Sequence, residues 1–410
     1  MSRVKSKNKF LIMLSILGPG LITANAGNDA GGVTTYSVVG AHYGYSMLWG
    51  MFVIAIGLAV VQEMNARMAV VTGKGLSDLI RERFGVKWAF FAMAVLLIAN
   101  LGVCIGDFAG VAASLELFHV NKYISIPILT ILIWIIVTQG NYSKAEKIFL
   151  LLTITFFSYF ITAFLIKPDW SHVFTSIVRP HAKFDKGYFL VLIGLVGTTI
   201  TPYMQFYLQS SIVDKGISLK EYGYEKVDVY FGTFWAILTA LFITVCTAET
   251  LFKAGIRIDT AQDAALALKP LAGNYSFILF AVGLLGASFL ACCVIPLCTA
   301  YAVCEAFGFE SGIDNRIKEA PVFFGLFFIM LVVSAIIVMM PNISLINVIL
   351  ATQQLAGILC PIVLIFMIIL VNDEEVMGKH VNNLLQNIIA KSTVILIIVL
   401  TILAFAGNFI

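Results

Sequence analysis

Long apolar runs recur from one end of this chain to the other, and they constrain its fold more than any other feature. Several exceed roughly 18 residues, the length at which an apolar run is read as a bilayer-spanning helix. Hydrophobic residues make up 60% of the sequence and charged residues 12%, unlike a soluble globular domain. Because backbone polar groups in lipid must be satisfied within the segment, such runs form helices. The sequence therefore predicts an all-α polytopic membrane protein.

Marking the runs gives about eleven spans, and the connecting segments are too short to hold a soluble domain. We expect one transmembrane domain over 1–410, with a first repeat at about 10–167, a second at about 188–371 and an additional helix at about 389–408. The spans lie at roughly 10–40, 44–70, 88–117, 122–140, 147–167, 188–213, 227–252, 274–306, 321–340, 345–371 and 389–408.

Lysine and arginine are distributed unevenly between the two sides of the predicted bundle. With a cytoplasmic N-terminus, 18 of the 26 basic side chains fall inside and 8 fall outside. An excess of basic residues in short cytoplasmic loops sets the topology of membrane proteins. We therefore predict a multi-pass protein of the cell (plasma) membrane with its N-terminus in the cytoplasm.

The first span is interrupted by residues that are unusual in a lipid-facing helix. Residues 16–36 hold five glycines, a proline and one carboxylate, Asp29. Irregular backbone and buried charge persist at membrane depth only where they line a protein or water cavity. A glycine-broken helix with one acid at the break favours a cation site in a transporter. The alternative is a protonated aspartate that caps a helix fragment.

The sixth span is also interrupted, at Val196–Phe206, where Pro202 removes a backbone donor and blocks the helix bond four residues back. The two breaks are five spans apart. Interrupted helices at corresponding positions of two halves indicate an inverted-repeat transporter with its site near the bilayer midplane. The spacing predicts two five-helix repeats with broken helices one and six, plus an eleventh helix.

The polar groups near the two breaks are hard oxygen donors. Asp29 supplies the charge, and Thr198 and Thr201 add hydroxyl oxygens from the second break. Such donors suit Mg²⁺, Ca²⁺ or Mn²⁺, whereas softer transition metals prefer sulfur or imidazole. Neither break contains a histidine or a cysteine.

Two further intramembrane polar positions are candidates for function. Asp107 in span three is predicted to be a proton relay or a pore-lining charge, or else to lie at a water-filled vestibule. Gln353 in span ten is predicted to ligate or gate the ion, or to serve as an ordinary interhelical hydrogen-bonding group. The seven cysteines lack zinc-site spacing, and we interpret all of them as packing residues.

These residues resemble the Nramp family of divalent-metal transporters, and the likeness runs from about Leu17 to Ile410. The family's Asp-Pro-Gly-Asn in helix one reads Asp29-Ala-Gly-Gly here, and its Met-Pro-His in helix six reads Thr201-Pro-Tyr. The resemblance implies a LeuT-type (leucine-transporter-type) fold with a metal site built from helices one and six. Further matches are Gly40–Trp49, Asp107, the spacing from Gln353 to Pro361, and Val376–Asn383.

The chain departs from the family pattern at two ligands and at the proton-linked positions. The ligating asparagine is Gly32 and the ligating methionine is Thr201, so the resemblance favours a harder or more hydrated ion, as in Nramp-related magnesium transporters. The helix-six histidine is Tyr203, and the helix-three glutamate is Gly110. Val322–Met340 has no charged residue in place of the family's arginines. These losses imply transport without strict proton coupling.

We predict a transporter that moves divalent metal ions, Mg²⁺ or Mn²⁺, by alternating access, and that is not an enzyme. Its partners are the ion and the lipid bilayer, with no cofactor and no nucleic acid. The alternatives are a proton-coupled Mn²⁺ or Fe²⁺ symporter and an organic-solute symporter on the same fold. The resemblance implies a metal site of Asp29, the carbonyls near Ala26 and Thr198, Gly32, Thr201 and Gln353, with Asp107 and Tyr203 on the proton or ion pathway.

Overall fold

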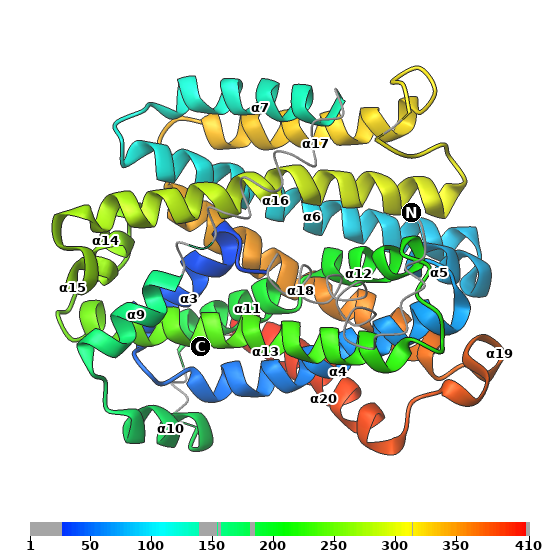
Figure 1. Cartoon of the computed structure of the whole chain (residues 1–410), viewed down its shortest axis with the longest axis horizontal. Helices are drawn as coiled ribbons and strands as arrows, with labels where there is room; N and C mark the ends of the chain where they lie inside the picture. The colour runs from blue at the N-terminus through cyan, green and yellow to red at the C-terminus, as the bar shows by residue number, and fades with distance from the viewer. Residues whose placement is uncertain (1–26, 139–153, 155–156, 181–184, 314, 407–410) are drawn as a thin grey trace, which may run out of the picture.

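The computed structural model describes residues 27–138, 154, 157–180, 185–313 and 315–406, and no strand occurs in those ranges (Figure 1). The helices are α3 (Ala30–Tyr43), α4 (Leu48–Thr72), α5 (Leu76–Phe84), α6 (Val86–Glu116), α7 (Lys122–Thr138), α9 (Phe157–Ile166), α10 (Trp170–Val178), α11 (Lys186–Thr199), α12 (Pro202–Asp214), α13 (Tyr222–Thr247) with a π-helical end (Ala248–Phe252), α14 (Ala261–Ala265), α15 (Lys269–Ala272), α16 (Ser276–Phe307), α17 (Pro321–Met339), α18 (Leu345–Val371), α19 (Glu374–Met377) and α20 (Leu384–Ala406).

Where the structure describes the chain, the predicted spans correspond to these helices, and the all-α polytopic architecture is confirmed. Most of the first half of the predicted span at 147–167 lies outside the described residues. Within the described ranges, 8 segments are long and apolar enough to cross a membrane, and α7 and α9 are shorter apolar helices. α3 belongs to the first interrupted span, whose earlier half lies outside the described residues. The last helix begins at Leu384, earlier than the predicted 389.

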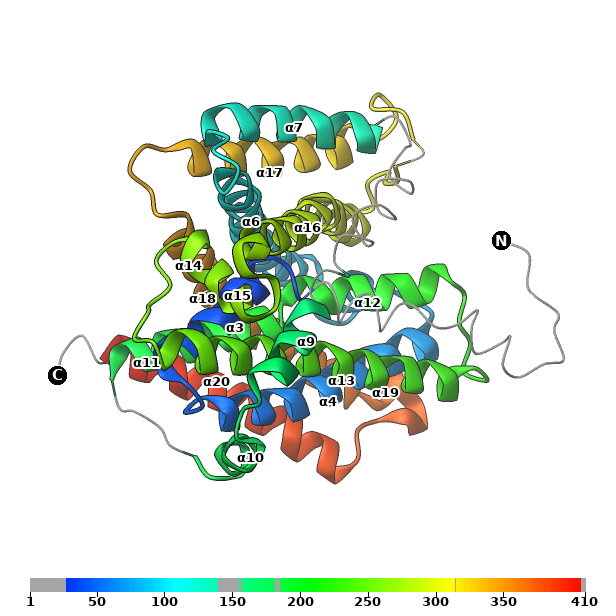
Figure 2. The ribbon, with the colours of Figure 1, turned by 60° about the vertical axis from the view of Figure 1, so that its left-hand side comes forward.

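The long helices run roughly along the longest axis of the molecule, in layers (Figure 1). α7 and α17 pair along one edge, α6 and α16 follow, and α4, α13 and α20 lie on the opposite side (Figure 2). α3, α11, α12 and α18 lie between these layers. α6 packs against both α16 and α18, and α18 packs against α11. The helices next to the two predicted breaks are therefore held at the centre of the bundle.

The break in the sixth span is confirmed. α11 ends at Thr199 and α12 begins at Pro202, so Ile200 and Thr201 interrupt the span. Pro202 occupies the start of α12, where its missing N–H costs no helical hydrogen bond. The interruption leaves the last carbonyls of α11 and the first amides of α12 without helical partners. These groups are free to bind side chains or a ligand.

α11 and α18 approach closely at a pair of glycines. A Cβ on Gly197 would overlap the backbone carbonyl oxygen of Gln353 and would lie 2.5 Å from the Gly357 amide nitrogen. A Cβ on Gly357 would in turn overlap the Ile193 carbonyl oxygen. Only glycine permits this contact of backbone with backbone. The glycine pair therefore seats the broken span directly against the helix that carries Gln353.

Glu63 and Arg67 of α4 form an ion pair as part of a buried network. Arg67 Nε lies 3.3 Å from Glu63 Oε1, and both residues are buried. Arg67 also donates to the His380 carbonyl oxygen at 2.9 Å and to the side-chain oxygen of Asn382. Glu63 accepts a hydrogen bond from Gln386 at 2.9 Å. The network fastens α4 to the segment that leads into α20.

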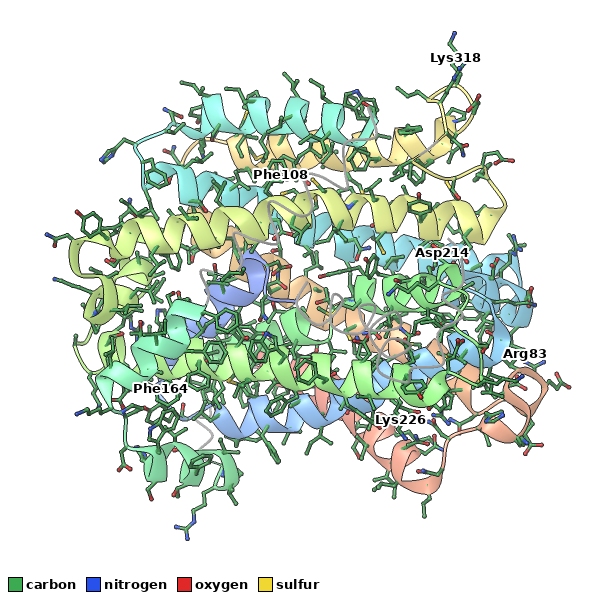
Figure 3. All side chains as sticks on the ribbon, viewed as in Figure 1. Arg83, Phe108, Phe164, Asp214, Lys226 and Lys318 are labelled. Atoms are coloured by element: carbon green, nitrogen blue, oxygen red, sulfur yellow. The ribbon has the colours of Figure 1, made fainter. Side chains whose placement is uncertain are left out.

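Three basic side chains lie toward one end of the bundle. Arg83, Lys226 and Lys318 lie toward the same end, and Phe164 lies toward the other (Figure 3). Arg83 Nη1 is paired there with Glu375 at 2.6 Å. The three basic residues are among the 18 that the sequence predicts to be cytoplasmic.

Candidate metal site

Asp29 is the N-cap residue of α3. Its Oδ1 accepts a hydrogen bond from the Gly32 amide at 2.9 Å, and the residue is only 4% exposed. An acid at this position satisfies an amide that the helix leaves unpaired, and it faces the positive end of the helix dipole. The capping geometry that we named as an alternative for Asp29 is thus present. Capping accounts for one carboxylate oxygen.

Asp107 reaches the same helix end from α6. Its Oδ1 accepts a hydrogen bond from the Ala30 amide at 3.2 Å, and the residue is fully buried. Its Oδ2 has no hydrogen-bond partner within the described ranges. Figure 3 labels its neighbour Phe108, which lies near the middle of the long axis. Two carboxyl groups from distant parts of the chain therefore meet at the N-terminus of α3, away from solvent.

α18 brings the side chain of Gln353 against the start of α3. A Cβ on Gly31 would overlap the Gln353 amide nitrogen, and a Cβ on Gly106 would lie 3.8 Å from the same atom. Gln353 is 1% exposed, and its Nε2 finds no hydrogen-bond partner among the residues described. Rotation of the amide exchanges its nitrogen and oxygen, so the same position can present a carbonyl oxygen to a cation.

Gly32 offers no side chain, and backbone fills the space beside it. A Cβ on Gly32 would overlap the carbonyl oxygen of Gly27. The Gly27 carbonyl thus stands where a side chain at position 32 would begin, and sequence reasoning did not single it out. The signal available was the glycine itself, because glycine permits close approach of another backbone. Ala26, whose carbonyl is a predicted ligand, lies outside the described residues.

The second break lies alongside α3. The Tyr36 hydroxyl is 3.2 Å from Thr199 Oγ1, and this contact joins α3 to the end of α11. The Thr201 hydroxyl donates to the Thr198 carbonyl oxygen at 3.1 Å, so that predicted ligand carbonyl is already engaged. Thr198 Oγ1, by contrast, is buried and has no hydrogen-bond partner in the described part of the chain.

Tyr203, on the first turn of α12, is buried. The Cys360 thiol of α18 donates to the Ile200 carbonyl oxygen at 3.0 Å. One of the cysteines that we predicted to be packing residues therefore also donates a hydrogen bond. Its acceptor is a carbonyl oxygen that the break leaves without a helical partner.

The two buried carboxyl groups of this site favour the binding of a cation, because no ion pair supplies them with a positive charge within the described ranges. The ion pairs found within the described ranges include neither Asp29 nor Asp107. A buried carboxylate without a counter-charge is costly. Those ranges also contain no group of three acidic, thiol or imidazole side chains that could hold a metal ion. A cation here would use one or both carboxylates and complete its shell with neutral oxygens and water.

The profile of the Nramp family, described as natural resistance-associated macrophage protein-like, matches residues 20–406. The chain belongs to the Nramp family. Among the relatives of this Nramp protein is the divalent metal cation transporter MntH of Yersinia pestis (strain Pestoides F), 24% identical over 404 residues, which cover 94% of this chain and 93% of the relative. The protein of the same name from Ralstonia nicotianae is 31% identical over 300 residues, covering 67% of this chain and 65% of the relative.

Solved structures share the fold of this Nramp protein. The manganese transporter of Eremococcus coleocola, in complex with an aromatic bis-isothiourea substituted compound, matches with a TM-score of 0.78 at 17% identity, covering 99% of this chain and 90% of that one. MhsT in complex with L-phenylalanine matches with a TM-score of 0.60 at 14% identity, covering 99% and 100% of the two chains. The predicted LeuT-type fold is confirmed.

Proposed function

We propose that this chain moves divalent metal cations across the plasma membrane by alternating access, with Mg²⁺ or Mn²⁺ as the ion and without strict proton coupling. Its N-terminus would be cytoplasmic. The names of the Yersinia pestis and Ralstonia nicotianae relatives support divalent metal transport. The observation that carries the proposal is the buried pair Asp29 and Asp107 at the N-terminus of α3.

The driving force for such uptake would be the membrane potential. It supplies about 2.3 kcal/mol per elementary charge per 100 mV, and a divalent cation entering the cell gains about twice that. The carboxyl groups supply the negative charge that compensates the ion for lost hydration at the bilayer midplane. No co-transported proton is required for this gain.

The donor set supports a hard ion. The groups near the two breaks are carboxylates, hydroxyls and backbone or amide carbonyls, which are the ligands of Mg²⁺ and Mn²⁺. Thr201 stands at the family's methionine position with its hydroxyl bonded to the Thr198 carbonyl oxygen. Thr201 therefore contributes a hydroxyl oxygen at the position where the family has a thioether sulfur.

Three features support transport without proton coupling. Gly110 is packed too tightly for a side chain, because a Cβ there would overlap the Cβ of Ala30 and lie 2.5 Å from Ser288 Oγ. α17 contains no charged residue over its length, Pro321–Met339. Tyr203 replaces a histidine with a group that does not titrate near neutral pH. At these three places the chain thus lacks the titratable or charged groups that the family pattern has there.

The organic-solute alternative receives less support from the packing. Asp29, Gln353, Thr198 and Thr201 are each at most 4% exposed. The Gln353 side chain leaves no room for a single added carbon on Gly31. A solute as large as an amino acid would need more space than the Gln353 side chain leaves beside Gly31, whereas a metal ion would need less.

The test is uptake into proteoliposomes with an imposed inside-negative potential and a pH indicator in the lumen. Mg²⁺ or Mn²⁺ is expected to enter with no acidification of the interior, because no proton accompanies the ion. Protein-free vesicles are the control. Metal entry with matching acidification would favour the proton-coupled symporter instead, and entry of no divalent ion would contradict metal transport.

Thr201→Met is expected to shift the ion preference toward Mn²⁺ and Cd²⁺ over Mg²⁺, by about tenfold, because it adds a soft thioether at the break and removes a hydroxyl. It also frees the Thr198 carbonyl oxygen, to which the hydroxyl donates. Competition among the three ions in the uptake assay measures the shift. Thr201→Ser, which keeps the hydroxyl, is the control, and an unaltered ranking in Thr201→Met would show that this side chain does not face the ion.

A further inference from the structure

A row of polar side chains follows α12 from the second break toward the far end of the helix. Thr201, Gln205 and Gln209 are spaced four residues apart, so they share one face of the helix. The Gln205 amide nitrogen donates to the Thr201 carbonyl oxygen at 3.4 Å. α12 ends at Asp214, which lies toward the same end of the bundle as Arg83 (Figure 3). The row therefore leads from the candidate metal site toward the end that the sequence predicts to be cytoplasmic.

α4 packs against α12 and adds an amide to this row. Asn65 donates from Nδ2 to the Gln205 carbonyl oxygen, and the same nitrogen lies 3.5 Å from Gln205 Oε1. Further along, Gln209 Nε2 donates to the Lys74 carbonyl oxygen at 2.9 Å. Lys74 follows the end of α4 and is exposed. Asn65, Thr201, Gln205 and Gln209 thus form a polar seam between the two helices, which begins at the buried break and ends at the surface.

Two amide oxygens of the polar seam are unsatisfied. Asn65 Oδ1 and Gln209 Oε1 are buried and have no hydrogen-bond partner within the described ranges. Each of these amides donates its N–H to a backbone carbonyl oxygen, so exchanging its nitrogen and oxygen would place two acceptors together. A contact that only holds two helices together normally satisfies its buried polar groups. The two oxygens are therefore available to water or to an ion.

We propose that the polar seam is the inner part of the ion pathway, where Gln205 and Gln209 offer oxygens to the ion after it leaves Thr201. The inference rests on the proposed function and deepens it, because it assigns the route of release. Mg²⁺ keeps several of its waters when it binds to proteins, and amide oxygens can replace some of the others. Conduction also requires binding that is weak enough for the ion to leave. Neutral amides meet that requirement, whereas the charged carboxylates of the site favour retention.

The polar seam is closed to water in this conformation. Its four side chains are each at most 2% exposed. Alternating access requires the inner route to open when the site faces the cytoplasm. Water would then reach the amide oxygens, and residues outside the seam would stay dry.

The test is modification of introduced cysteines by a positively charged methanethiosulfonate reagent, which reacts with thiols that are in contact with water. Gln209→Cys is compared with Leu208→Cys in proteoliposomes that have the reagent on both faces of the membrane. Leu208 is a matched control, because it is the preceding residue, is equally buried, and packs in an apolar cluster with Ala66 and Ala69 of α4. The unaltered chain, whose own cysteines are all buried, gives the background.

Gln209→Cys is expected to react at least about tenfold faster than Leu208→Cys, since a thiol reacts only where solvent reaches it. The modified Gln209→Cys chain is expected to lose metal uptake, because the attached cation blocks the route. Equal rates for the two variants, or no reaction of Gln209→Cys above the background, would overturn the proposal.

A second measurement separates release of the ion from binding. Gln209→Leu is expected to lower the maximal rate of Mn²⁺ uptake about tenfold, because the ion loses an oxygen that replaces its water. The Kd for Mn²⁺ in detergent is expected to stay unchanged, since Asp29 and Asp107 remain. Gln262→Leu, at an exposed glutamine of α14, is the control and is expected to keep both values.

An unchanged uptake rate in Gln209→Leu, or a Kd that weakens as much as the rate falls, would overturn the role of Gln209 in release. If no metal enters with the unaltered chain, the proposed transport fails. The reaction of Gln209→Cys would still show whether water reaches the polar seam.

Discussion

Asp29→Asn is expected to abolish divalent-metal uptake, by at least about a hundredfold. Asparagine is nearly the same size and is also a good N-cap residue, so α3 keeps its first turn. The substitution removes the negative charge, and without it a divalent ion in the buried site loses its closest compensating charge. Proteoliposome uptake of Mg²⁺ and Mn²⁺ measures the effect, with the thermal unfolding midpoint as a check on folding.

Asp185→Asn is the matched control for this experiment. Asp185 caps α11 in the same way, accepting a hydrogen bond from the Tyr188 amide at 2.9 Å, but it is exposed and lies outside the site. This variant is expected to transport normally. Uptake that is equal in Asp29→Asn and Asp185→Asn would mean that Asp29 is only a helix cap.

Gly197→Ala is expected to destabilise the bundle by about 3 kcal/mol, at the upper end of the range for overpacking. The added carbon would meet the Gln353 carbonyl oxygen and the Gly357 amide, which are backbone atoms of α18 and cannot rotate away. α11 and α18 must therefore separate, and the site that they flank separates with them. A fall in the unfolding midpoint in detergent measures the loss.

Gly325→Ala is the comparison, because Gly325 lies within α17 and a Cβ there would meet nothing within 4 Å. Alanine in a helix is favoured over glycine by about 1 kcal/mol, so this variant is expected to be unchanged or slightly more stable. Equal midpoints for the two variants would show that the contact between α11 and α18 is loose.

The spans and the second break were predictable because both are local. Hydropathy over a window of residues fixes each span, and Pro202 ends one helix and begins another wherever it stands. Asp29 was identifiable because a carboxylate is rare in an apolar run. Asp107 was identifiable on the same ground, but its position at the α3 terminus was not, because the bond from the Ala30 amide to Asp107 joins residues 77 positions apart.

The remaining features depend on how helices pack. No pattern within α18 reveals that the Gln353 side chain fills the space beside Gly31, since that contact depends on the glycine pair that draws α11 onto α18. The sequence pattern assigns residues to helices, whereas the residues that form the site depend on which helix faces pack against one another.

The buried Arg67 network has a consequence for how the protein is made. Arg67 is synthesised early, yet its His380 partner lies 313 residues further along the chain. Until that segment emerges from the ribosome, the guanidinium has only Glu63 on its own helix. A buried charge short of its partners costs several kcal/mol, so an unfinished chain must keep this end of α4 open to water. The final helix therefore does more than add a span, because its arrival completes the burial of a charge inserted at the beginning of synthesis.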